Sequence, residues 1–102
     1  MENNGFFPRE RAEFFAETLK ALGHPLRLQI VDLLAKGEMC VGDIAETVSE
    51  KQAIVSQQLK ILRMVALVKT CRRDGKSFYS LNNPHLDDLL SCLKRCGECG
   101  NE

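Results

Sequence analysis

Residues 40–63 read CVGDIAETVSEKQAIVSQQLKILR, the most informative stretch of the chain. Its first part carries apolar residues at the i, i+3, i+4 and i+7 positions of a short helix: Val41, Ile44, Ala45 and Val48. Ser49, with Gln52 three residues later, is typical of a capping box, so we expect another helix to begin there. That helix also has apolar residues at helical spacing: Ile54, Val55, Leu59, Ile61 and Leu62. Two short helices about a tight turn predict a helix-turn-helix.

Two further helices are expected before this stretch. Pro8 suits the first turn of a helix from about Arg9 to Leu22, and Gly23 ends it. A second helix follows His24-Pro25, with a C-terminal stop at Gly37. Its apolar residues lie largely on one side of the helix: Leu26, Leu28, Ile30, Val31, Leu33 and Leu34.

The pattern changes from helical spacing to alternation after residue 65. Residues 67–71 and 77–81 favour strands, and Asp74-Gly75 between them is a strong signal for a hairpin turn. Residues 82–84 close the hairpin and open a last helix from His85 to about Cys96. The expected order is therefore ααααββα, mainly α with a β-hairpin wing, which is a winged helix-turn-helix.

Length and composition predict one domain in a chain of 102 residues, because two cores would each be too small. We expect a flexible N-terminus over 1–8, a folded domain over 9–96 and a flexible cysteine-containing tail over 97–102. No apolar run approaches the roughly 20 residues of a membrane span. The first residues also lack the basic and apolar regions of a signal peptide. A cytoplasmic protein without a membrane partner is expected.

The formal net charge of zero hides a strong asymmetry along the chain. Residues 51–76 contain seven basic residues and one acid, a charge of +6, and the rest of the chain, with seven basic residues and thirteen acids, carries −6. The seven basic residues are Lys51, Lys60, Arg63, Lys69, Arg72, Arg73 and Lys76. A cationic face beside acidic flanks can meet phosphates in one orientation, so a nucleic-acid partner is expected. An ordinary solvated face is the alternative.

Four motifs in order resemble the arsenic-repressor-type (ArsR/SmtB) family of winged-helix transcriptional repressors, over roughly residues 15–95. They are ALGHPLRLQI at 21–30, VGDIA at 41–45, VSQQLKILR at 55–63, and RRDGK at 72–76 followed by FYSL at 78–81. Two residues depart from the family pattern. Gln58 replaces a common histidine, and Ala66 replaces a common glycine, so Ala66 must accept a left-handed backbone or a different turn. The resemblance implies a repressor that binds operator DNA.

The helix from about Lys51 to Arg63 is expected to lie in the major groove. Gln52, Ser56 and Gln57 are the candidates for base contacts, because amides pair with adenine and hydroxyls adapt to donors or acceptors. The candidates for phosphate contacts are Lys60 on this helix and Arg72, Arg73 and Lys76 on the wing.

The resemblance also implies a homodimer formed through the first and last helices. Two-fold dimers on palindromic sites are the usual way for a small domain to bind an operator. The expected interface consists of two apolar stripes: Phe14, Phe15 and Leu19 on the first helix, and Leu86, Leu90 and Leu93 on the last. The alternative is that these stripes complete the core of the monomer.

Five cysteines in a reducing compartment favour metal binding or redox sensing over disulfides. Cys92, Cys96 and Cys99 share one face of the last helix and suit a soft ion with sulfur ligands. Cys40 is a further candidate ligand, because the resemblance implies that sites at the start of the third helix also occur in the ArsR/SmtB family. The alternative is that Cys40 is a partly buried apolar residue. Cys71 is expected to be structural or incidental.

The three-sulfur set favours As(III) as the inducer, with Cd(II) and lead as further candidates. Zinc is less expected, because histidine is scarce and His24 is expected to be structural. His85 with Asp88 resembles one half of the zinc-ligand pattern on the last helix of ArsR/SmtB relatives, but the second half is missing. Thiol oxidation or persulfide formation without a metal is the main alternative, and an iron–sulfur cluster is a weaker one. No cofactor is expected for DNA binding itself, and no catalytic set of residues indicates an enzyme.

Overall fold

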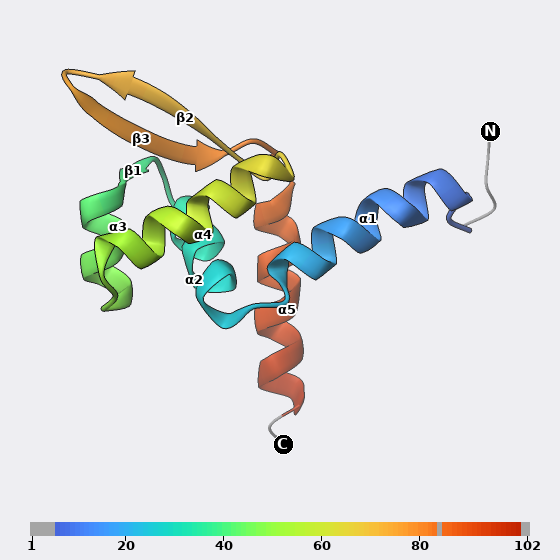
Figure 1. Ribbon diagram of the computed structural model, residues 1–102. Coiled ribbons are helices and arrows are strands. Elements are labelled where there is room, and N and C mark those ends of the chain that lie inside the picture. Colours follow the sequence, from blue (N-terminus) through green and yellow to red (C-terminus); the bar gives the residue numbers. More distant parts are fainter. Residues whose placement is uncertain (1–5, 84, 101–102) are drawn as a thin grey trace.

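The computed structural model describes residues 6–83 and 85–100, the last three by their backbone alone. The elements in order are α1 Arg9–Leu22, α2 Pro25–Leu34, β1 Met39–Cys40, α3 Val41–Val48, α4 Gln52–Met64, β2 Val68–Arg73, β3 Lys76–Leu81 and α5 Leu86–Gly100 (Figure 1). The predicted winged helix-turn-helix is confirmed, with β1 as an additional strand. None of the described helices has the length and apolar character to cross a membrane.

The wing is an antiparallel sheet of three strands in the order β1-β3-β2. The β2–β3 hairpin pairs Val68 with Leu81 at its base and Arg73 with Lys76 at its tip. Asp74 and Gly75 form the two-residue turn with φ of 52° and 78°, as a type I′ hairpin turn requires. The predicted Asp-Gly turn is therefore confirmed.

The core lies among α2, α3, α4, the base of the wing and the first half of α5. The largest fully buried side chains are Ile30, Val31, Ile44, Val55, Leu59 and Leu62. Leu67 and Val68 continue this core into the wing, so the base of the hairpin is packed and its tip projects. By contrast α1 extends away from the body of the protomer, and its buried residues are Ala21 and Leu22 at its C-terminal end (Figure 1).

The capping box predicted at Ser49 is wrong. Ser49 has φ of 60° and is the C-cap of α3, and the N–H groups of Ser49 and Glu50 donate to the carbonyls of Glu46 and Ala45. The left-handed residue reverses the chain and satisfies the last carbonyls of α3. Lys51 instead precedes α4 as its N-cap, without a side-chain capping bond.

Two other boundaries also differ from expectation. Cys40 belongs to β1 and precedes α3 rather than lying within that helix. The last helix runs to Gly100, four residues beyond its expected end. Residues 1–5 and 101–102 of the expected flexible termini lie outside the described residues.

Ala66 adopts the left-handed conformation, with φ of 63°. It follows α4, and its N–H donates to the carbonyl of Arg63 over 2.9 Å. The side-chain nitrogen Nδ2 of Asn82 in turn donates to the carbonyl of Ala66 over 3.1 Å. The chain therefore keeps the backbone that glycine would favour at this turn, at some conformational cost.

Candidate nucleic-acid interface

The exposed surface of α4 carries polar side chains together with the exposed apolar residues Ile54, Ile61 and Met64. Val55, Leu59 and Leu62 point inward and are fully buried, which fixes the rotation of the helix. Ser56, Gln57 and Lys60 consequently lie on the exposed part of its surface. The structure thus brings together two of the residues predicted to contact bases and one predicted to contact phosphate.

Gln52 lies at the first position of α4 and is exposed, beside α3. A Cβ atom at Gly42 would be 3.4 Å from its amide nitrogen Nε2, so this amide lies close to the backbone of α3. The third predicted base contact therefore lies where the two helices meet. The sequence did not indicate this role for Gly42, because the contact depends on how α3 packs against α4.

The wing carries exposed cations at its tip. Nη1 of Arg72 donates to Oγ of Ser77 over 3.1 Å, and Nη2 donates to the carbonyl of Gly75 over 3.2 Å. Side chains alternate along a strand, so Arg72 and Arg73 lie on opposite faces of the sheet. Lys76 pairs directly with Arg73 and shares its face. The basic residues of the wing are therefore divided between its two faces.

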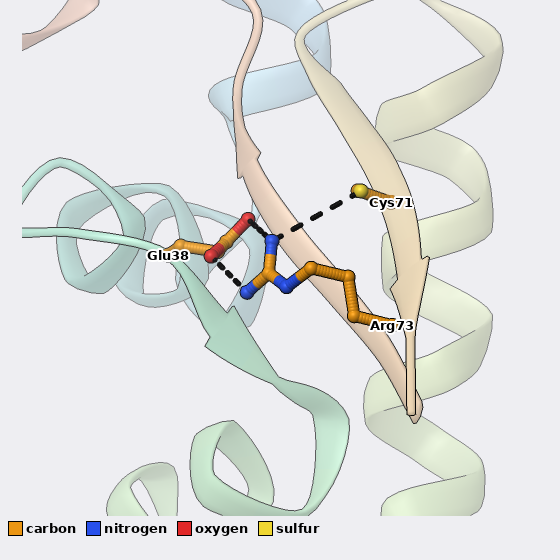
Figure 2. Close-up of polar contacts among 3 residues, drawn as sticks. All are labelled: Glu38, Cys71 and Arg73. Carbon is orange, nitrogen blue, oxygen red and sulfur yellow. Dashed lines mark hydrogen bonds and ion pairs between the residues drawn. The ribbon is translucent and has the colours of Figure 1, made fainter. Parts of the chain in front are cut away.

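Arg73 is engaged within the protein. Figure 2 shows its guanidinium reaching from β2 to Glu38, which precedes β1. Nη2 lies 2.6 Å from Oε1 of Glu38, and Nη1 donates to Oε2 over 3.1 Å. The guanidinium carbon is 4.4 Å from the centre of the Phe78 ring, and Nη1 is 4.0 Å from the Cys71 sulfur. The sequence did not indicate this arrangement, because Glu38 and Arg73 are 35 residues apart.

The two charges of this pair shift each other's titration. The hydrogen bond from Arg73 lowers the pKa of Glu38, and the hydrogen bond to Glu38 raises the pKa of Arg73. Both groups are therefore ionised at neutral pH. Arg73, one of the cations predicted to contact phosphate, therefore already has an anionic partner, Glu38, in the same chain.

Comparisons with known proteins place this geometry in a family. The family model described as bacterial regulatory protein, arsR family, matches residues 24–70. A biofilm growth-associated repressor from Xylella fastidiosa is 37% identical over 84 residues, which cover 82% of this chain and 74% of that repressor. The chain belongs to the ArsR family. It is therefore a transcriptional regulator rather than an enzyme, as predicted.

Solved structures extend this ArsR likeness to the fold. Reduced HlyU from Vibrio cholerae matches with a TM-score of 0.79 and 28% identity, over 86% of this chain and 93% of that one. The homodimeric winged helix-turn-helix DNA-binding domain of Mb0332 from Mycobacterium bovis matches with a TM-score of 0.78 and 28% identity. That match covers 94% of this chain and 91% of the Mb0332 domain.

The cysteines of this ArsR-family chain are distributed over two regions. Cys92 and Cys96 lie one turn apart on α5, and both are exposed free thiols. The side chain of Cys99 lies outside the described residues. Cys40 is half-buried on β1, at the edge of the wing sheet, whereas the C-terminal end of α5 lies apart from β1 (Figure 1). Within the part of the chain that the structure describes, no group of three metal-ligating side chains is assembled.

The two histidines have different surroundings. Nδ1 of His24 accepts a hydrogen bond from the N–H of Leu26 over 3.2 Å, so His24 caps α2, as its expected structural role implies. Nδ1 of His85 lies 3.8 Å from a carboxylate oxygen of Asp88, and both side chains are almost fully exposed. This exposed pair carries no sign of a built zinc site.

Proposed function

We propose that this ArsR-family chain is a homodimeric repressor that binds duplex operator DNA and is released when cysteine thiols of α5 bind a soft metal ion or metalloid, such as As(III) or Cd(II). The observation that supports DNA binding most directly is the outward face of α4. It exposes a hydroxyl, an amide and an ammonium group beside a basic wing.

In the proposed complex α4 lies in the major groove and the wing lies beside the adjacent minor groove. Gln52, Ser56 and Gln57 contact base edges, where side-chain amides and hydroxyls discriminate between base pairs. Lys60, Arg72 and Lys76 contact phosphates, and these contacts set the register of the protein without reading sequence. Arg73 differs from these cations because Glu38 already binds it.

The proposed dimer uses apolar side chains that the single chain leaves in solvent. Phe14 is 59% exposed, Leu19 56% and Leu93 45%. A groove of about 320 Å³ lies between α1, the turn after α4 and the start of α5. A second copy of the chain suits this groove, because the related Mb0332 domain is described as homodimeric. Leu86 and Leu90, by contrast, are buried in the core of the single chain. These two residues of the predicted stripe on the last helix therefore complete the core of the monomer, which was the alternative to a place in the dimer interface.

The proposed sensor is the cysteine set Cys92, Cys96 and Cys99. The first two are exposed one turn apart on α5, the separation at which two thiolates of one helix can hold the same ion. Cys40 is a further candidate ligand, supplied from β1. Ion binding that distorts α5 would change the separation of the two α4 helices in the dimer. By linkage, operator DNA then weakens ion binding by the same factor.

A redox-responsive repressor of the same fold is the second candidate. Exposed free thiols on α5 favour it, since oxidation to a disulfide or a polysulfide link needs access to the sulfur atoms. The related HlyU from Vibrio cholerae is described in a reduced form.

Fluorescence anisotropy of the reduced protein on its own promoter DNA tests both candidates. The complex is titrated with arsenite, cadmium, zinc and a persulfide donor. We expect arsenite or cadmium to raise the Kd for DNA about 100-fold, a coupling of about 2.7 kcal/mol. Release by the persulfide donor alone would favour the redox candidate.

Variants of the cysteines locate the sensor in the same assay. Replacing Cys92, Cys96 and Cys99 together by Ser should leave DNA binding intact and abolish release. Cys71→Ser is the matched control, because it removes an exposed thiol of the wing instead. Release of the triple variant by arsenite or cadmium would contradict the proposed site and direct attention to Cys40.

A further inference from the structure

We infer that Glu38 competes with DNA for Arg73 and so limits how strongly the wing binds phosphates. This inference rests on the proposed DNA-binding function and adds to it a residue that acts through another. Glu38 would be a positioning residue whose carboxylate holds a wing cation against the surface of the protein.

The contact spans the whole width of the wing. Arg73 ends β2, Phe78 lies on the central strand β3, and Glu38 directly precedes β1 at the opposite edge (Figure 2). The guanidinium crosses the sheet over the Phe78 ring and reaches both carboxylate oxygens of Glu38. Paired hydrogen bonds and stacking on an aromatic face together fix the direction of this side chain. Arg73 is therefore directed back toward β1 rather than outward from the tip.

The pair remains within reach of an external anion. The Arg73 side chain is 49% exposed and that of Glu38 is 36% exposed. Both side chains are in contact with solvent, so a phosphate can approach the guanidinium once the carboxylate is removed. Lys76 lies directly opposite Arg73 in the hairpin, and two like charges at paired positions repel. A guanidinium released from Glu38 would therefore be drawn to a DNA phosphate.

The wing should keep its place without this ion pair. β1 pairs with β3 through Met39 with Tyr79 and Cys40 with Phe78, and these backbone contacts do not involve the Glu38 carboxylate. Val68 at the base of the hairpin is buried in the core. Removing the carboxylate should thus free a cation without detaching the hairpin.

The test measures the Kd for duplex DNA at 50 and 200 mM salt for the wild type and for Glu38→Gln, which keeps the shape of the side chain and removes its charge. The salt ratio is the Kd at 200 mM salt divided by the Kd at 50 mM salt. One additional phosphate contact raises this ratio about 3.5-fold, because each contact releases about 0.9 counterion. We expect that increase for Glu38→Gln, together with a lower Kd at 50 mM salt. In the Arg73→Gln background the same substitution should leave the ratio unchanged.

Glu46→Gln is the matched control, because it removes an exposed carboxylate of α3 and releases no wing arginine. A salt ratio that rises no more for Glu38→Gln than for Glu46→Gln, or weaker DNA binding by Glu38→Gln, would overturn the inference. Nitrogen-15 NMR of the Arg73 side chain gives an independent measurement. Its Nε–H signal should respond to DNA in Glu38→Gln and stay unchanged in the wild type, and a response in the wild type would also overturn the inference. A wild-type protein that binds no duplex DNA would instead refute the proposed function.

Discussion

The orientation of α4 about its own axis decides which of its side chains are buried and which are exposed. Burial of Val55 and Leu59 leaves Ser56 and Gln57 on the opposite, exposed surface. Gln52 lies at the start of the helix, with its side-chain amide close to Gly42 of α3. Residues that read bases must be exposed, and all three of these side chains are.

Alanine substitutions test the proposed base contacts. Ser56→Ala and Gln57→Ala should each reduce discrimination between operator and random duplex DNA by about 1–3 kcal/mol, because a lost base contact affects only the correct sequence. Binding to random DNA should change little. Competition anisotropy on both DNAs measures this, with Lys60→Ala as the matched control that should weaken both complexes alike. Equal losses on the two DNAs for Gln57→Ala would assign that residue to phosphate positioning.

At the level of elements, the turn between α4 and β2 sets the angle at which the wing leaves the recognition helix. Ala66 holds this turn in a left-handed conformation, with hydrogen bonds to Arg63 and from Asn82. Leu67 directly follows and donates from its N–H to the carbonyl of Leu62 over 2.9 Å. The turn is therefore fully hydrogen-bonded, although its central residue is not the one that this backbone favours.

Ala66→Gly should accordingly stabilise the protein. Glycine removes the left-handed strain of roughly 1–2 kcal/mol from the folded state. It also makes the unfolded chain more flexible, which costs about 0.4–1 kcal/mol of stability. The free energy of unfolding should therefore rise by about 0.5–1 kcal/mol. Urea denaturation followed by circular dichroism measures the free energy of unfolding. Ala53→Gly, at an exposed position in the first turn of α4, is the matched control and should destabilise by up to about 1 kcal/mol. A loss of stability in Ala66→Gly would contradict the role given to this turn.

For the whole molecule, the proposed function requires two copies of the chain to place their α4 helices correctly on DNA. Successive major grooves lie about 34–36 Å apart, so a dimer must hold its two α4 helices at that spacing. Within one chain α1 projects from the body and exposes its apolar stripe, and α5 continues beyond its contacts with the core. A dimer built on these helices would connect the proposed thiol sensor on α5 to the geometry of DNA binding.

Charged residues on α1 should dissociate the dimer. Phe14→Glu together with Leu19→Glu places two carboxylates where apolar contacts are proposed, and desolvating them across an interface is unfavourable. Sedimentation analysis should show a monomer, and operator affinity should fall because one half-site remains. Met64→Glu, at an exposed apolar residue of α4, is the control and should leave the oligomeric state unchanged. A dimeric double variant would place the interface elsewhere.

The chain by itself determined the order of its elements apart from β1, and the burial of Val55, Leu59 and Leu62 on α4. Helical spacing, the Asp74-Gly75 turn and the glycine after α1 are local signals, and each acts within a few residues of the backbone it shapes. The basic segment indicated a nucleic-acid partner, and the resemblance of the four motifs to the ArsR/SmtB family implied a transcriptional regulator. Ser49 shows the limit of this reasoning, because the same residue suits a helix start and a left-handed stop.

Only the tertiary structure decided which predicted residues are free to act. The register of β1 against β3 brings Glu38 to Arg73, and packing of α5 buries Leu86 and Leu90 in the core of the single chain. These outcomes depend on contacts between residues far apart in the chain. Local periodicity carries no information about such contacts, because a strand or helix of given pattern can meet many partners, and the packing of the whole core selects one.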